Sequence, residues 1–451
     1  MKGLLILVLA ALFGYLWASG QQDGEKAVAA AGNQENAIEI YWWHAMNAAL
    51  GEKVDQIAAD FNAAQSRYKV IPVNKGNYSD TMTAGIAAFR SKEQPHIIQV
   101  YEVGTGTMMA ARGAIRPVYQ VMKEANADFN PDAFLAAVTG YYTTPEGQML
   151  SMPFNSSTPV MYYNKDAFAA AGLDPETPPK TWEDVERVSR ILLDKGVVTA
   201  GFTTTWPSWV MLENFSAWHD IPIATRGNGF SGMDTEFTFN TGDVVKHHEK
   251  LAVWQKEKIF KYGGRKSEAG PLFNTAEVAM TFGSSAGYAG YKKNCDFNWG
   301  TSTLPYWESM VDEPQNSIIG GASLWVFEGH SREEYKGVAE FFSYLSSAEV
   351  QADWHQFTGY LPVTYAAYEL TKRQGFYDAN PGTETALLQM TRSNPTANSK
   401  GLRFGNYNQI RDIINDEQEA IFSGSKTARE GMDNAVKRGN DLLRQFEAAN
   451  K

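Results

Sequence analysis

An arginine and two serines are the residues of this chain best suited by type to hold a small anionic ligand. Arg411 lies in QIRDII at the edge of an apolar helix face, and its guanidinium fork suits paired, charge-assisted bonds to phosphate. Ser157 in NSST and Ser284 in FGSSAG are small hydroxyls beside turns, which can donate to phosphate oxygens. Each also has a plainer interpretation, because Arg411 can pair with Asp412 or Glu417 at the surface, and serines in loops are usually structural.

Two predicted strands contain residues that are unusual there, an acid, Glu102, in one and a pair of glycines in the other. Glu102 stands at the end of the predicted strand 97–102, directly after its apolar residues, and a buried carboxylate there needs partners, either ligand hydroxyls or a structural lysine or arginine. Gly320 and Gly321 interrupt the apolar strand IIGGASLWV, although Gly in a strand interior costs about 0.5–1 kcal/mol relative to Ala. The glycines indicate either a β-bulge or a place where another group lies against the backbone.

The sequence carries no recognisable catalytic or metal-binding motif. It contains no GxSxG and no paired acids in a recognisable loop, and its seven histidines show neither HxxxH nor HxH spacing. The single Cys295 excludes an internal disulfide and Cys-based zinc sites. The enzyme alternative, a secreted phosphodiesterase or glycosidase, needs one of these devices. We therefore expect a binding protein without catalysis, cofactor or metal.

The length of the chain indicates more than one domain, and its charge and aromatic content indicate which partners suit it. With 451 residues the chain is long enough for two or three domains. The net charge of −11, with no long basic run, argues against nucleic acid as a partner. Aromatic residues make up 13% of the chain, and their flat faces suit sugar rings and other stacked ligands, although core packing is the commoner role of a single tryptophan.

The N-terminus has the pattern of an export signal. Met1 and Lys2 precede an apolar stretch at 4–18, and small residues then favour cleavage after Gly20. We therefore interpret residues 1–20 as a signal peptide and 21–37 as a flexible linker, with the protein acting in the periplasm. An uncleaved membrane anchor is the alternative, although the apolar stretch is shorter than the roughly 20 residues of a spanning helix.

Three strands and two helices near the N-terminus predict a parallel sheet. Apolar patterns indicate strands at 38–43, 68–73 and 97–102 and helices at 50–61 and 78–90. This order predicts helices on both faces of the sheet, with ligands beyond the carboxyl ends of the strands. Three loops should therefore meet at one rim, and they carry Trp43, His44, Lys75 to Tyr78, and Glu102 to Gly104.

Strands and helices also alternate in the middle of the chain. A strand is predicted at 160–163, a short helix at 165–171, and a further helix after Thr181, whose side chain can cap it with Asp184. Another helix is predicted around an apolar face at 338–345. Residues 367–451 are expected to be mostly helical.

The stretch YYNKDAFAAAGLDPETPPKTWEDV (162–185) resembles the signature of the extracellular solute-binding proteins of ABC importers, in the maltodextrin-binding cluster. Further segments resemble the glycerol-phosphate branch of this family, and the similarity runs from residue 38 to the C-terminus. These segments are KGNYSDTMTAGIAAFR (75–90), QVYEVGTGTMMA (99–110), PFNSSTPVMYYNKDAF (153–168), LENFSAW (212–218), IIGGASLWV (318–326), WHQFTGYLPVT (354–364) and GLRFGN (401–406).

The resemblance implies an α/β fold of two lobes, the type II periplasmic-binding-protein fold. Each lobe is expected to hold a mixed or parallel sheet flanked by helices, with the ligand between the lobes. The implied N-terminal lobe is 38–153 plus 322–359, and the C-terminal lobe is 154–321 plus 360–451. The chain should cross between them near 153–158, 318–323 and 358–362.

The resemblance also implies the ligand contacts. In chain order they are Trp43, Tyr78, Glu102, Ser157, Trp206, Ser284, Gly321, Tyr360 and Arg411. Arg411 is expected to hold a phosphate, and Gly321 to form the floor of the cleft, where the ligand reaches backbone N–H groups. Because a carboxylate repels phosphate, Glu102 is expected at the glycerol end, away from Arg411.

The four aromatic residues of this set have different expected parts. Tyr78 and Tyr360 offer phenolic hydroxyls on flat apolar faces, whereas Trp206 and Trp43 can wall the carbon chain of the ligand. Each of them taken alone is more often a core residue than a ligand wall.

The resemblance implies the periplasmic substrate-binding component of an ABC importer. Such a protein captures sn-glycerol-3-phosphate by lobe closure and delivers it to the permease in the membrane. Glycerophosphodiesters such as glycerophosphocholine are a further expected ligand, and a neutral oligosaccharide of maltodextrin type is the alternative. The chain is expected to act as a monomer.

Overall fold

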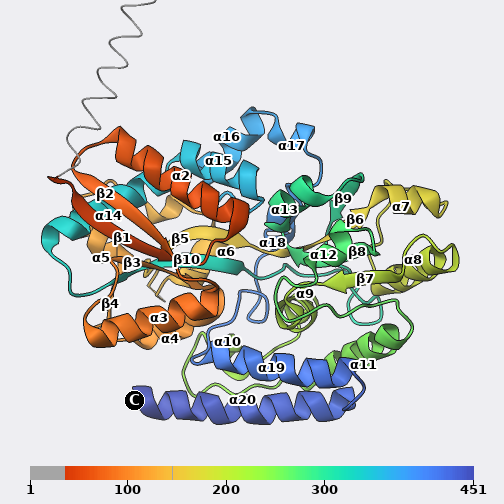
Figure 1. The fold of residues 1–451 in the computed structure, drawn as a ribbon. Helices are drawn as coiled ribbons and strands as arrows, with labels where there is room; N and C mark the ends of the chain where they lie inside the picture. Colours follow the sequence, from red (N-terminus) through yellow and green to blue (C-terminus); the bar gives the residue numbers. More distant parts are fainter. Residues whose placement is uncertain (1–35, 145) are drawn as a thin grey trace, which may run out of the picture.

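The computed structural model of the chain describes residues 36–144 and 146–451. The expected leader, residues 1–20, and the expected linker as far as residue 35 lie outside this part. Within it, two β-sheets, each flanked by helices, form two lobes beside one another (Figure 1). No described helix is long and apolar enough to cross a membrane.

The first sheet has the strand order β2-β1-β3-β10-β4, and β5 also pairs with β10. The predicted parallel arrangement of β1, β2 and β3 is confirmed, whereas β10 runs antiparallel to β3, β4 and β5. Its strands are β1 Ile38–His44, β2 Tyr68–Asn74, β3 Ile97–Tyr101, β4 Ile115–Arg116, β5 Met152–Ser157 and β10 Gly320–Phe327. Its helices include α2 Ala48–Ala64, α3 Tyr78–Ser91, α4 Thr105–Ala110, α5 Val118–Glu124, α6 Ala136–Tyr142, α14 Arg332–Leu345 and α15 Ala348–Thr358.

The second sheet has the order β7-β8-β6-β9, in which β6 is antiparallel to both its neighbours. Its strands are β6 Pro159–Asn164, β7 Ala200–Thr204, β8 Val278–Ser284 and β9 Trp299–Ser302. The predicted cap of α8 is confirmed, because the Thr181 hydroxyl accepts the N–H of Asp184. Its helices are α7 Lys165–Ala170, α8 Trp182–Asp194, α9 Phe215–Trp218, α10 Thr225–Asn228, α11 Gly242–Lys256, α12 Gly270–Asn274 and α13 Gly287–Asn294.

The C-terminal part is helical, as predicted. Its long helices α19 and α20 lie side by side along one edge of the molecule (Figure 1), and both pack against α11. Helix α19 also contacts the turn Glu102–Gly104, which follows β3 of the first sheet. The elements are α16 Tyr365–Arg373, α17 Phe376–Ala379, α18 Thr385–Met390, α19 Tyr407–Phe422 and α20 Ala428–Asn450.

The chain passes from the first sheet to the second at Thr158, the residue between β5 and β6. The Thr158 hydroxyl lies 2.6 Å from the hydroxyl of Ser317 and donates to the carbonyl of Ile318 at 3.0 Å. The N–H of Leu361 donates to the carbonyl of Ser156 at 2.7 Å. Three segments far apart in sequence therefore meet at this crossover. The lobe limits given above stay a prediction.

Both interpretations of the glycine pair have a counterpart in the structure. The register of β10 against β5 shifts between Ala322 and Ser323, so a β-bulge is present. Gly321 has a φ of +85°, and a Cβ there would lie 1.9 Å from the carbonyl oxygen of Asn155. A Cβ on Gly320 would lie 2.2 Å from the ring of Trp209. The groups that lie against this backbone are therefore a neighbouring strand and an indole.

Burial keeps three histidines neutral at pH 7. His219, His248 and His355 place Nδ1 2.5–2.8 Å from a backbone carbonyl, to which it donates. In His219 the Nε2 atom accepts the N–H of Trp307 at 2.9 Å, so a proton there would break this bond. Burial lowers the pKa of all three histidines to about 4.

We expect these histidines to make the protein lose stability as the pH falls below about 6.5. Their folded-state pKa lies below the unfolded one, so the unfolded chain binds more protons, and each unit of difference is worth about 1.4 kcal/mol. The stability is complete above the unfolded pKa and is lost as the pH falls toward 4. Urea unfolding at pH 7.5, 6.5 and 5.5 measures this, before most carboxylates titrate. An unfolding free energy that stays level over this range would contradict it.

Candidate functional site

A cavity of about 110 Å³ is bordered by residues from both lobes, next to the crossover. Eight of the nine predicted contact residues line it, and Trp43 does not. Two further aromatic residues, Tyr101 and Trp209, complete the wall. The lining residues are Tyr78, Tyr101, Glu102, Ser157, Trp206, Trp209, Ser284, Gly321, Tyr360 and Arg411.

One end of the cavity is charged, because Arg411 on α19 lies between two carboxylates. Its Nη1 is 2.7 Å from Glu102 Oε1, and its Nε and Nη2 donate to the two oxygens of Glu213 at 2.9 and 2.5 Å. All three residues are at most 7% exposed. The predicted separation of Glu102 from Arg411 is therefore wrong. The physical reason is that a buried carboxylate needs a compensating partner, and here the chain itself supplies the cation.

Glu213 is the functional candidate that the sequence analysis missed. It lies in the π-helical segment Trp209–Asn214, which runs into α9, and its side chain is almost completely buried. The available signal was a single acid inside the mostly apolar stretch WVMLENFSAW. π-Helical turns are frequent at functional sites. Here the turn brings the carboxylate of Glu213 into a two-bond contact with Arg411.

The charged end has a formal charge of −1 when both acids are ionised. Burial raises the pKa of Glu102, and the nearby Arg411 opposes this rise. Burial alone would lower the pKa of Arg411, but Glu213 and Glu102 outweigh it and hold this pKa well above its usual value. The guanidinium therefore stays protonated. A second anion beside it would meet two carboxylates, which disfavours a phosphate at this end.

The other end of the cavity is built from neutral donors near the crossover. Asn155 Nδ2 donates to the Tyr78 hydroxyl at 2.8 Å, and the Tyr78 hydroxyl also interacts with that of Tyr360. Ser157 ends β5 opposite Gly320, and Ser284 ends β8. This end therefore offers several hydroxyl groups, and Glu102 is the one carboxylate that lines the cavity. Burial and, to a smaller extent, the charge of Glu102 raise the pKa of Tyr78 and Tyr360.

Aromatic rings are fixed around these polar groups. Tyr78 and Tyr101 stack with their centroids 5.2 Å apart, and Tyr360 stacks on Trp354 at 5.7 Å. Trp206 lies in the left-handed region with a φ of +52°, a strained conformation for a tryptophan. Such rings can pack against the carbon atoms of a small ligand.

Trp43 lies on the predicted rim of the first sheet, but it does not line the cavity. The Nζ of Lys75 lies 3.7 Å from the centroid of the Trp43 ring, and both residues belong to the rim of the first sheet. This cation–π contact accounts for the exposed face of the indole. Trp43 is therefore not among the residues that we assign to the cavity.

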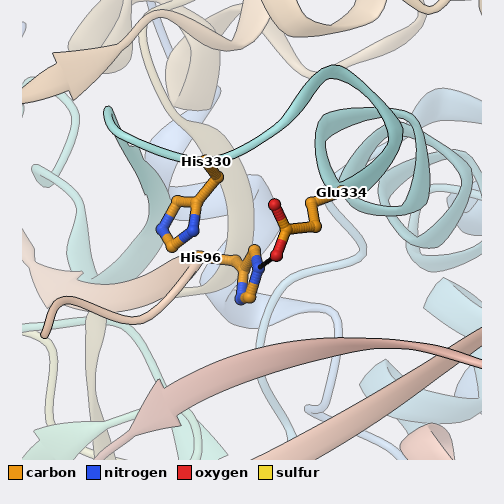
Figure 2. Close-up of side chains that lie close together, drawn as sticks. All are labelled: His96, His330 and Glu334. Carbon is orange, nitrogen blue, oxygen red and sulfur yellow. Dashed lines mark hydrogen bonds and ion pairs between the residues drawn. The ribbon is translucent and has the colours of Figure 1, made fainter.

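A separate cluster of His96, His330 and Glu334 lies between the start of β3, the end of β10 and the start of α14 (Figure 2). His96 Nδ1 accepts the N–H of Tyr41 at 3.0 Å, so its proton is on Nε2, 3.2 Å from Glu334. His330 Nε2 donates to the carbonyl of Pro95 at 3.1 Å. Both oxygens of Glu334 accept hydrogen bonds, from His96 and from the N–H of Ser331, so only Nδ1 of His330 is left as a ligand atom in this cluster, fewer than a zinc site needs. We interpret the cluster as a structural link.

The chain matches the model of the bacterial extracellular solute-binding protein family over residues 56–385. It is 51% identical over 420 residues to the sn-glycerol-3-phosphate-binding periplasmic protein UgpB of Yersinia pseudotuberculosis, covering 93% of this chain and 95% of that one. It is 49% identical over 425 residues to the UgpB of Escherichia coli strain K12, covering 94% and 97%.

Solved structures show the same fold at lower identity. UgpB from Mycobacterium tuberculosis in complex with glycerophosphocholine superposes with a TM-score of 0.76 at 18% identity, covering 91% of this chain and 99% of that one. Maltose-bound MalE3 of T. maritima gives a TM-score of 0.73 at 16% identity, covering 90% and 100%. The match to the family model and the identity of about half of the residues over nearly the whole chain place this protein among the bacterial extracellular solute-binding proteins.

Proposed function

We propose that this chain is the substrate-binding component of an ABC importer for sn-glycerol-3-phosphate. The observation that carries the proposal is the single cavity that gathers eight of the nine expected contact residues from both lobes. Relatives with about half of their residues identical, over nearly their whole length, bear the name of glycerol-3-phosphate-binding proteins. Since the members of this family bind solutes, the chain is a binding protein and not a hydrolase.

The geometry supports one orientation of the ligand. The phosphate fits the neutral end, where Ser157, Ser284 and Tyr360 can donate hydroxyl protons and Gly321 gives access to the backbone. The glycerol hydroxyls can both donate and accept, so they suit the alternating charges of Arg411 and its carboxylates. This orientation replaces the one expected from sequence, in which Arg411 held the phosphate.

The same cavity supports capture by lobe closure. Tyr78 and Glu102 belong to the first lobe, whereas Ser284 and Trp206 belong to the second, so one small ligand can touch both lobes only when they are close together. A ligand favours the state in which it makes more contacts, and this differential contact shifts the molecule toward closure. The closed form then delivers the ligand to a permease in the membrane. The protein acts in the periplasm as a monomer, and nucleic acid is not one of its partners.

Glycerophosphodiesters are a second candidate ligand class, because the solved relative from Mycobacterium tuberculosis holds glycerophosphocholine. The small cavity disfavours a maltodextrin, since pockets for larger ligands are commonly about 300–1,000 Å³.

Calorimetric titration with glycerol-3-phosphate, glycerophosphocholine and maltose tests this proposal. We expect binding of glycerol-3-phosphate, and a loss of about tenfold in affinity or more for Ser157→Ala and for Ser284→Ala, because a hydrogen bond to a charged group is worth about 1.5–3 kcal/mol. Ser91→Ala, at an exposed position on α3, is the matched control and should bind as the wild type does. Binding of maltose without glycerol-3-phosphate would favour the oligosaccharide alternative instead.

A further inference from the structure

A second cavity of about 460 Å³ lies beside the crossover and shares no lining residue with the ligand cavity. We call it the hinge cavity. It lies between α6 and the segment 395–403, and the residues 316–319 that lead into β10 form part of its wall. The only charged residues that line it are Lys400 and Arg403. The other lining residues are neutral, so the wall of this cavity carries a formal charge of +2 in a chain with a net charge of −11.

Both cations lie against one aromatic ring. The Nζ of Lys400 is 4.4 Å from the centroid of Phe230, and the guanidinium carbon of Arg403 is 4.2 Å from it. The Nη2 of Arg403 donates to backbone carbonyls at the C-terminal end of α6, including that of Tyr141 at 2.7 Å. Its Nε is buried and has no hydrogen-bond partner within the described chain. Arg403 is therefore anchored through one nitrogen and has donor capacity left.

Neither cation has an acidic partner in the described part of the chain. Neither Lys400 nor Arg403 takes part in an ion pair within the described residues, so both lie against Phe230 without a counter-ion. Burial lowers the pKa of Arg403, and burial together with the charge of Arg403 lowers the pKa of Lys400. Two uncompensated like charges at a partly buried site repel each other, and an anion between them removes this repulsion.

We propose that the hinge cavity binds a phosphate-type oxyanion between Lys400 and Arg403. The Nη1 of Arg403 has no hydrogen-bond partner within the described chain, and the ammonium group of Lys400 offers a point charge, a combination suited to a compact oxyanion. Inorganic phosphate and the phosphate group of an organic phosphate share this chemistry. The proposal is independent of the function proposed for the ligand cavity.

The position of the hinge cavity couples it to the ligand cavity. Ile318 and Ile319 line the hinge cavity, and Gly321, two residues further along, lines the ligand cavity. Arg403 holds α6 of the first lobe from a segment that leads into α19, which carries Arg411. An anion in the hinge cavity therefore contacts the same crossover that borders the ligand cavity. If the anion changes the affinity for the ligand, the ligand must change the affinity for the anion by the same factor.

Methionine methyl NMR distinguishes the two cavities, because Met390 lines the hinge cavity and no methionine lines the ligand cavity. We expect inorganic phosphate, titrated at constant ionic strength into full-length protein, to shift the Met390 methyl resonance in a saturable way. Lys400→Gln should raise the dissociation constant about tenfold, the factor that corresponds to about 1.4 kcal/mol. Lys400 is exposed, so this change should leave the fold intact.

Two further variants make the test specific. Lys437→Gln removes an exposed lysine on α20 and should titrate as the wild type does, whereas Lys400→Glu places a carboxylate beside Arg403 and should abolish the Met390 shift. The first equivalent of glycerol-3-phosphate is expected to fill the ligand cavity. If further glycerol-3-phosphate then shifts the Met390 resonance, the hinge cavity also takes an organic phosphate. If only inorganic phosphate shifts it, the hinge cavity takes the free anion. A wild-type protein without a saturable shift, or a Lys400→Gln titration equal to that of Lys437→Gln, would overturn the proposal.

Discussion

Arg411→Ala should abolish ligand binding and lower the free energy of unfolding by about 3–5 kcal/mol at pH 7, the range for breaking a buried ion pair. Arg411 lies between Glu102 and Glu213, and all three side chains are almost fully buried. The substitution leaves two carboxylates close together without a cation. Urea unfolding measures the loss of stability, and calorimetric titration with glycerol-3-phosphate measures the loss of affinity.

The pH dependence of the Arg411→Ala variant identifies the cause of its instability. Burial already raises the pKa of Glu102, and removing Arg411 takes away the group that opposes this rise. A carboxyl group whose folded-state pKa exceeds its unfolded one binds more protons when folded, so the defect is present at high pH and shrinks as the pH falls through the raised pKa. We expect a larger difference from the wild type at pH 8 than at pH 5.5. A difference that is constant over this range would indicate lost packing instead.

A variant that neutralises the whole triad separates folding from binding. Glu102→Gln, Glu213→Gln and Arg411→Met together remove every charge while keeping similar volumes, and buried ion pairs replaced in this way are often neutral or stabilising. This triple variant should recover most of the stability lost in Arg411→Ala and still fail to bind the ligand. A triple variant with wild-type affinity would exclude the charged end of the cavity from the ligand site.

The main strands and helices of the first lobe could be predicted from local patterns, because their apolar periodicity is carried by neighbouring residues. The contact set came from the resemblance, and the structure gathers eight of its nine members at one cavity. Trp43 is the exception, since its ring is already covered by Lys75. Local periodicity gives no means of deciding whether a rim aromatic faces a ligand or a lysine.

The electrostatic partners could not be predicted in the same way. Arg411 and Glu213 are separated by 198 positions, so no local pattern links them. Two partners were open for the carboxylate of Glu102, the hydroxyls of a ligand or a structural lysine or arginine, and the folded chain supplies the arginine. His96 and His330 likewise lie close together only because β3 pairs with β10 (Figure 2). They are far apart in the sequence, so the spacing of histidines along the chain does not predict their contact.

Gly321→Ala should damage both stability and binding, because two separate constraints act on this residue. Its φ of +85° costs a non-glycine residue about 1–3 kcal/mol, and its Cβ would lie 1.9 Å from the carbonyl oxygen of Asn155, a backbone atom that cannot turn aside. Overpacking of this kind costs about a further 1–3 kcal/mol. We therefore expect a combined loss of roughly 2–6 kcal/mol in unfolding free energy, the sum of these two ranges.

The binding defect of Gly321→Ala follows from the position of Asn155. Its side chain donates to the Tyr78 hydroxyl at 2.8 Å and accepts from Gln99 at 2.7 Å, so a displaced Asn155 also displaces the neutral end of the cavity. We expect the affinity for glycerol-3-phosphate to fall at least tenfold. Gly172→Ala is the matched control, because Gly172 has a φ of +76° with no atom within 4 Å of its Cβ position. Gly172→Ala should lose only the unfolding free energy that the positive φ costs a non-glycine residue, and it should keep wild-type affinity. Equal losses of stability and affinity in the two variants would show that the close contact with Asn155 is not the reason for glycine at position 321.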